Sequence, residues 1–250
     1  MISLRSVANS CLEVSGGFSV RRDVFGYVWG PLEDRSLSLS DHLNQISGEA
    51  FDITVILVGH EPGLAGWFDQ DDVNQIQSAI DWAREIYAQA GLGIRRIYWA
   101  YIPTADANGY DVIGSGNEAT DLTNDWSGAP ADSQDVFYVT SVDGADGWSN
   151  QNGPCNKDLD KQRTGNVLQV YQPSEIGGLE NRNESAGVLL AHEIGHYLGL
   201  AGGTDGDSNL MGADDDPPFG VDEISRNSKG ITSAQITTIL GHCSVKPPCA

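Results

Sequence analysis

The sequence predicts an α/β domain built on a twisted, mostly parallel β-sheet with a long backing helix. Three successive segments support this: a β-branched run at 51–59, an amphipathic stretch from Val73 to Tyr87, and a second apolar run at 94–103. The two runs are typical of buried strands, and the stretch between them repeats apolar residues at helical spacing. A strand, a helix and a strand in this order favour a parallel pair joined by a crossover helix.

The central helix carries clear boundary signals. Asp69, Asp71 and Asp72 offer an N-cap and favourable first-turn charges. Gly91, in AGLG, is suited to end the helix, and Pro103 stops the strand that follows. These signals place the helix between the two strands.

The rest of the chain adds two strands and two helices to the prediction. Apolar runs at 135–142 and 166–173 predict strands. ESAGVLLAHEIGHYLGL, at 184–200, predicts a helix, and 231–243 predicts a C-terminal helix with Ser233 as a candidate cap. The intervening segments are rich in Gly, Asp and Pro, so we expect them to form loops.

The length of 250 residues suits one domain of ordinary size with an extension. Residues 1–50 are weakly patterned, and we expect an N-terminal extension or pro-segment there and the main domain over 51–250. No apolar run approaches the roughly 18–20 residues of a membrane helix. The N-terminus lacks the continuous apolar core of a signal peptide, so the chain is either not exported by that route or numbered from after a removed leader.

The charge excludes some classes of partner. The chain has 35 Asp and Glu against 14 Lys and Arg, a formal net charge of −21. Such a surface repels phosphate groups, which argues against nucleic acid and anionic membrane partners. Ten aspartates fall between residues 106 and 160 and five more within 205–216. They suit either a solvated face or calcium sites, because calcium prefers clustered oxygen ligands.

Four cysteines occur, at positions 11, 155, 243 and 249. An even number permits two disulfides in three connectivities, and the alternative is four free thiols. No Cys-x-x-Cys pair is present, which argues against a cysteine zinc ribbon.

The strongest chemical signal is His192-Glu193-Ile194-Gly195-His196. Residues four apart share one face of a helix, so both imidazoles can reach one zinc ion. Glu193, beside the first histidine, is placed to act as general base toward a water that the zinc activates, and then to return the proton to a leaving amine. This pattern predicts a zinc hydrolase.

The surrounding residues resemble the metzincin zinc metallopeptidases, in particular matrixin-like members. The resemblance rests on HEIGHYLGL, with Gly199 three residues after His196, and on Met211 in SNLMG. It implies that Gly199 ends the helix and turns the chain toward the metal, and that Met211 lies beneath the zinc without binding it. The strand, helix and strand upstream and the C-terminal helix are also similar to that family. The resemblance implies a catalytic domain over 51–250 that cleaves polypeptides.

One ligand position departs from that family. The third zinc ligand, a His or Asp six residues after the second histidine, falls on Gly202, or on Gly203 if the alignment is anchored on Met211. Neither has a side chain that can bind metal. Asp205 is the favoured substitute because the glycine-rich loop can carry it inward; the alternatives are Asp207 and a site without a third protein ligand. Turn formation, or a calcium loop that ends at Asn209, is the other explanation for both aspartates.

Two other hypotheses about the function stay open. In a gluzincin-type hydrolase the third ligand is a later glutamate, and Glu223 follows His196 by 27 residues. With Gly202 at the ligand position, the domain is alternatively a catalytically impaired pseudo-protease that binds proteins. For the enzyme we expect a secreted monomer that uses zinc, and calcium if the acidic loops bind it.

Overall fold

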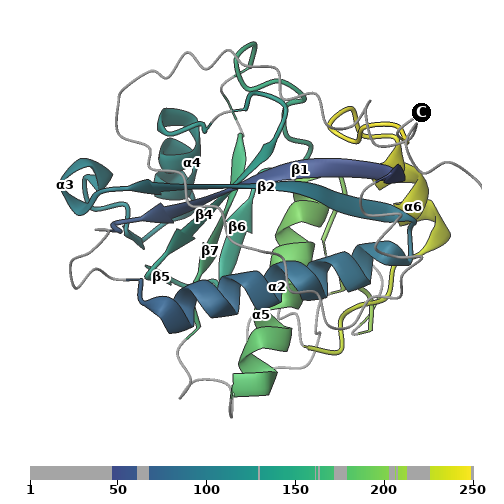
Figure 1. Ribbon diagram of the computed structural model, residues 1–250, viewed down its shortest axis with the longest axis horizontal. Coiled ribbons are helices and arrows are strands. Elements are labelled where there is room, and N and C mark those ends of the chain that lie inside the picture. Colours follow the sequence, from purple (N-terminus) through teal and green to yellow (C-terminus); the bar gives the residue numbers. More distant parts are fainter. Residues whose placement is uncertain are drawn as a thin grey trace, which may run out of the picture.

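The computed structural model describes residues 47–60, 68–128, 130–160, 162, 164–171, 179–202, 206, 208–212 and 226–248 (Figure 1). The predicted extension or pro-segment lies outside the described residues except for its last four. The predicted α/β class is confirmed, because helices pack around a mostly parallel sheet.

The main sheet has five strands in the order β2-β1-β4-β7-β6. Their bounds are β1 Glu49–Val58, β2 Leu92–Ile102, β4 Gln134–Val139, β7 Gly165–Gln169 and β6 Gly147–Ser149. The first four strands are parallel to one another, and β6 pairs antiparallel with β7. This places β6 at one edge of the sheet.

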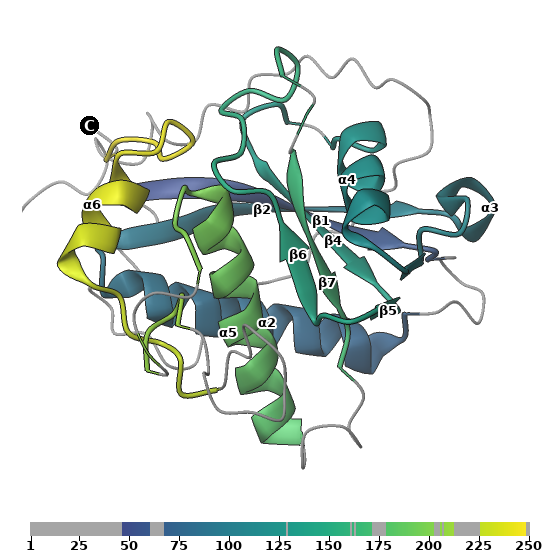
Figure 2. The same cartoon turned by 180° about the vertical axis from the view of Figure 1, so that it is seen from behind.

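Both faces of the sheet are covered, which explains why β1 is apolar at successive positions from Val55 to Val58. Its odd-numbered residues from Phe51 to Leu57 pack into a core with helices α2 (Gln70–Ala88) and α5 (Leu179–Tyr197). Ile56 and Val58 point the other way, into a second core with helix α4 (Gly116–Asp125). Figure 2 shows α5 beside the edge strand β6, with α4 on the opposite side of the sheet.

The central helix has the predicted start. Asp69 is its N-cap and accepts hydrogen bonds from the backbone N–H groups of Asp71 and Asp72, while the Asp72 side chain accepts from the Asp69 N–H. This reciprocal arrangement satisfies donors that the first helical turn leaves open. Gly91 adopts a φ of 66° just after the helix, as its predicted terminator role requires.

Several element boundaries differ from the prediction. The strand predicted at 135–142 divides into β4 and β5 (Ser141–Val142), because the Thr140 N–H and hydroxyl both donate to the Asp111 carbonyl. β5 consequently pairs with β3 (Val112–Ile113) in a separate two-stranded sheet. β7 ends at Gln169, and Tyr171 instead donates its N–H to the Gln75 side chain.

The helices also differ in length and capping. The helix predicted at 184–200 runs from Leu179 to Tyr197, and the C-terminal helix α6 is shorter than predicted, at Ser233–Leu240. Ser233 is not its cap: Thr232 and Gln235 form a reciprocal capping box instead. Helix α4 and the short helix α3 (Thr104–Ala107) lie where only loop was expected.

Candidate metal centre

Helix α5 brings His192 and His196 together as the four-residue spacing predicts. Their ring centroids are 4.6 Å apart, and the two Nε2 atoms are separated by 3.0 Å. Two nitrogens bound to one tetrahedral zinc at its usual bond length are about 3.3 Å apart. The observed pair therefore differs from that requirement by only a few tenths of an ångström.

Backbone carbonyls determine which ring nitrogens face each other. The Nδ1 of His192 lies 2.7 Å from the Leu210 carbonyl oxygen, and that of His196 lies 3.0 Å from the Leu200 carbonyl oxygen. A carbonyl oxygen only accepts, so in a neutral ring each Nδ1 carries the proton and each Nε2 presents a lone pair. Two lone pairs facing each other at 3.0 Å repel unless a cation lies between them. The donor chemistry of this pair fits zinc.

Glu193 adds a buried carboxyl group to the same helix turn. Its side chain is 5% exposed, and its Oε2 atom has no hydrogen-bond partner. Burial raises the pKa of the Glu193 carboxyl to about 8. Such an orphaned buried acceptor is unusual in a folded protein and marks a place where another group is expected to bind.

The edge strand β6 touches this carboxyl group. A Cβ atom placed on Gly147 would lie 2.7 Å from Glu193 Oε1 and 3.0 Å from Leu189 Cδ1. The backbone of β6 therefore passes closer to Glu193 than any side-chain-bearing residue would allow. Sequence reasoning did not find Gly147, because nothing in the chain around it indicates which helix it faces.

Gly199 turns the chain back toward the site. Its φ of 97° is in the left-handed region, which favours glycine, and it follows the last helical residue by two positions. The Leu200 N–H then donates to the Gly195 carbonyl at 2.9 Å, which brings the Leu200 carbonyl to the His196 ring. The position of Gly199 agrees with the predicted turn.

Met211 packs directly beneath the histidine-bearing helix. It is completely buried, and a Cβ atom on Gly195 would lie 2.8 Å from its sulfur atom. Gly195, between the two histidines, thus leaves the space that the methionine occupies. A glycine in the middle of a helix, which is otherwise unfavourable there, is the local sequence feature that accompanies this close contact.

Gly202 lies beside the His196 ring and has no side chain that could act as a ligand. A Cβ atom there would be 3.2 Å from His196 Cε1 and 3.6 Å from its Nε2. Among the described residues, no three His, Cys, Asp or Glu side chains form a group that could hold a metal ion. This finding gives no support to calcium binding by the acidic loops within the described part of 106–160. Asp205, Asp207, Gly203 and Glu223 lie outside the described residues, so the third ligand stays a prediction.

A short segment caps the end of α5. The N–H groups of Asn152 and Gly153 donate to the carbonyls of His196 and Tyr197, at 2.9 Å and 2.8 Å. The Tyr197 hydroxyl donates to the Pro154 carbonyl at 2.7 Å. These bonds satisfy carbonyl groups that a helix end leaves without intrahelical partners.

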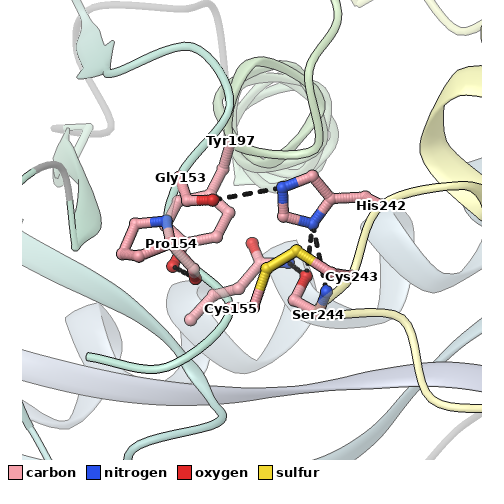
Figure 3. Close-up of a disulfide and its surroundings, with 8 residues drawn as sticks. Gly153, Pro154, Cys155, Tyr197, His242, Cys243 and Ser244 are labelled. Atoms are coloured by element: carbon pink, nitrogen blue, oxygen red, sulfur yellow. Dashed lines mark hydrogen bonds between the residues drawn. A yellow bond between two sulfur atoms is a disulfide. The ribbon is translucent and has the colours of Figure 1, made fainter. Parts of the chain in front are cut away.

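A disulfide fastens this capping segment to the C-terminal part of the chain (Figure 3). Cys155 and Cys243 are bonded, with their Cα atoms 5.5 Å apart, whereas Cys11 and Cys249 lie outside the described residues. His242 donates from Nε2 to the Gly153 carbonyl at 3.2 Å and accepts at Nδ1 from the Ser244 N–H. Burial lowers the pKa of the His242 ring. The bond is compatible with one of the three connectivities that the sequence allows.

The described residues include no helix with both the length and the apolar character needed to cross a bilayer.

Comparison with known proteins gives distant structural likenesses only. No family model and no curated protein matches the chain. The archaemetzincin of Methanopyrus kandleri is similar at 13% identity and a TM-score of 0.45, over 76% of this chain and 93% of that one. Metalloproteinase-II of Bacteroides fragilis is similar at 13% identity and a TM-score of 0.44, over 78% of this chain and 53% of that one. At this level of similarity, neither structure assigns a function to this chain.

Proposed function

We propose that this chain is a zinc-dependent endopeptidase in which His192 and His196 bind the metal and Glu193 is the general base. The observation that supports it best is the pair of Nε2 atoms 3.0 Å apart, each on a ring whose Nδ1 is engaged by a backbone carbonyl. The neighbouring orphaned carboxyl oxygen of Glu193 supplies the acid–base group that peptide hydrolysis needs.

Zinc at this site would act as a Lewis acid that polarises a substrate carbonyl and lowers the pKa of water. In its ionised form, which the positive charge of a bound zinc would favour over the protonated form, Glu193 would take the proton of the attacking water at Oε2, the oxygen that has no protein partner. It would then deliver that proton to the leaving amine, so one carboxyl serves both steps. The Leu200 and Leu210 carbonyls keep both imidazoles in the tautomer that presents Nε2 to the metal.

A polypeptide substrate is proposed to lie along β6 as an added strand. β6 is the edge of the main sheet, and its three residues are only partly buried. Strand addition requires backbone hydrogen bonds rather than particular side chains, so it suits varied peptides. Because Gly147 of β6 contacts Glu193, a peptide beside this strand would pass close to the general base.

Metal analysis and peptidase assays on matched variants test the proposal. We expect stoichiometric zinc in the wild type and a fall in kcat/KM of about 100- to 10,000-fold for Glu193→Gln, the range typical of general acid–base catalysis. Glu184→Gln is the control: it removes a carboxylate from the same helix, one that pairs with Lys229. A wild type without zinc or peptidase activity would reject the proposal.

For the third ligand we propose Asp205. Asp205→Ala is then expected to weaken zinc binding far more than Asp207→Ala in a chelator competition. Equal and negligible effects of the two variants would reject the assignment.

The second candidate function is a pseudo-protease that binds proteins without cleaving them. It is favoured by Gly202, which lies beside the His196 ring and has no side chain to complete the metal site. Zinc-free, inactive wild-type protein that still binds a polypeptide would support this candidate over the enzyme.

We also propose that the chain works as a monomer in an oxidising, extracellular environment. The Cys155–Cys243 disulfide supports this location, because such bonds persist mainly outside reducing compartments. Quantitative thiol labelling of protein recovered from its native source would test it: reactive Cys155 and Cys243 would contradict the proposal.

A further inference from the structure

The orientation of His192 depends on a turn that follows the helix. The Leu210 carbonyl that accepts from His192 Nδ1 belongs to the turn at 208–212, 18 residues further along the chain. The Leu210 N–H donates to the Gly230 carbonyl at 2.7 Å, so this residue is bonded on both sides. Any group that sets the position of this turn also sets the direction of the imidazole.

Asn209 is the side chain that holds the turn from within. Its Oδ1 accepts from the Met211 N–H at 2.8 Å, and its backbone carbonyl accepts from the Gly212 N–H at 2.9 Å. The residue is 5% exposed. The two hydrogen bonds that Asn209 accepts, from the Met211 and Gly212 N–H groups, therefore fix the backbone that follows Leu210.

Asn209 is in turn paired with Gln235 of helix α6. The Asn209 Nδ2 donates to Gln235 Oε1, and the Gln235 Nε2 donates back to Asn209 Oδ1, both at 2.9 Å. Gln235 Oε1 also accepts from the Thr232 N–H at 2.9 Å, as part of the capping box of α6. Both amides are buried, where an unmatched polar group is costly.

We propose that Asn209 and Gln235 are positioning residues for the His192 imidazole, acting through the Leu210 carbonyl. As a role in a zinc site, this inference rests on the function proposed above. The pair connects the C-terminal helix to the first metal ligand through the contacts Gln235–Asn209, Asn209–Met211 and Leu210–His192. Groups that orient metal ligands in this way typically change metal affinity about 10- to 100-fold when altered.

Glutamate in place of Gln235 disrupts the pair while keeping its shape. A carboxylate accepts but cannot donate, so one of its oxygens would face Asn209 Oδ1. Turning the Asn209 amide over would only move the repulsion to the other carboxylate oxygen, and it would withdraw Oδ1 from the Met211 N–H. Neither arrangement preserves both the amide pair and the turn. Asn209→Asp creates the same conflict, because an aspartate oxygen would replace Nδ2 and face Gln235 Oε1.

Gln75 provides a matched control. It is a buried glutamine with the same reciprocal pattern, donating to the Tyr171 carbonyl at 2.9 Å and accepting from the Tyr171 N–H at 3.0 Å. It belongs to helix α2 and not to the turn that holds His192. Gln75→Glu should therefore lower stability without a specific effect on the metal centre.

Two measurements on the full chain test the inference. In competition with a coloured chelator, we expect Gln235→Glu and Asn209→Asp to bind zinc about 10- to 100-fold more weakly than Gln75→Glu. In metal-free, ¹⁵N-histidine-labelled protein, the downfield Nδ1–H signal of His192, assigned by its absence in His192→Ala, should be lost or shifted only in the two turn variants.

The outcomes separate the inference from the function. If the wild type binds no zinc, the proposed enzymatic function is rejected. The His192 Nδ1–H signal alone then decides whether Asn209 and Gln235 position the imidazole. An unchanged His192 signal in folded Gln235→Glu and Asn209→Asp protein would overturn the inference. Zinc affinities within threefold of the Gln75→Glu control would also overturn it, even if the wild type is an active peptidase.

Discussion

Replacing Gly147 by alanine tests whether the edge strand sets the position of the Glu193 carboxyl group. Gly147 lies in β6 with ordinary extended backbone, so alanine introduces no backbone strain. Its new methyl group would lie 2.7 Å from Glu193 Oε1 and 3.0 Å from Glu193 Cγ. The substitution therefore acts on the proposed general base without changing it.

The size of the effect follows from the contact distance. Ordinary contact begins at 3.4 Å, so the carboxyl end must retreat by about 0.7 Å. Misplacement of a catalytic group by about 1 Å can cost roughly 100-fold in rate. We therefore expect Gly147→Ala to lower kcat about 10- to 100-fold, with a smaller effect on stability because the side chain that must move is flexible at its end.

Steady-state kinetics on a peptide substrate, zinc analysis and thermal unfolding together identify this effect. The expected result is a lower kcat with unchanged zinc content and a Tm within a few degrees of the wild type. Gly114→Ala is the control, because a methyl group there meets only the end of the exposed Glu118 side chain, at 3.3 Å. A Gly147→Ala enzyme with kcat within twofold of the wild type would refute the reasoning.

Three further predictions concern stability. In Gly187→Ala the new Cβ would lie 2.1 Å from Trp82 Cβ where α5 crosses α2, so overpacking should exceed the helix-propensity gain and lower Tm by roughly 4–8 °C in a thermal scan. Replacing both Cys155 and Cys243 by serine opens a link between residues 88 apart and should cost about 4.6 kcal/mol of unfolding free energy in urea. Burial lowers the pKa of the His242 ring, so the unfolded chain binds a proton at this ring more readily than the folded chain does. The free energy of unfolding should therefore fall as the pH drops below about 6.5, toward the folded pKa. Urea unfolding from pH 8 to pH 5 should therefore show a steeper loss for the wild type than for His242→Gln.

Each of these has its own control or contrary result. A Gly187→Ala protein as stable as the wild type would mean that the two helices separate at no cost. For the disulfide, reductant should reproduce the loss in the wild type and leave the double variant unchanged; equal sensitivity of both would contradict the assignment. Parallel pH profiles for the wild type and His242→Gln would show that the ring does not contribute.

Some of the fold was predictable because the signals are local. The β-branched and apolar residues at 51–58 indicated a buried strand, and Asp69 marked the start of α2. Ser115 and Glu118 form a Ser-x-x-Glu pattern, and the Ser115 side chain caps α4, so this helix also has a local signal in the sequence. The break at Thr140 had none, since it depends on a carbonyl 29 residues earlier in the chain.

The sequence by itself determined which side chains come together at the candidate site. Helical periodicity alone places His192 and His196 on one face with Glu193 beside them, because residues four apart on a helix meet whatever surrounds it. A glycine after the helix likewise indicated the turn at Gly199. These features depend on residues a few positions apart.

Only the tertiary structure decided how these groups are held. The carbonyl partner of His192 lies 18 residues away along the chain, and the amide pair behind it joins residues 26 apart. The contact of Gly147 with Glu193 and the choice of Cys155 with Cys243 depend equally on how strands and helices pack. Such contacts produce no periodic pattern in the sequence, because they join residues that lie far apart along the chain. The packing of strands and helices alone selects which residues become partners.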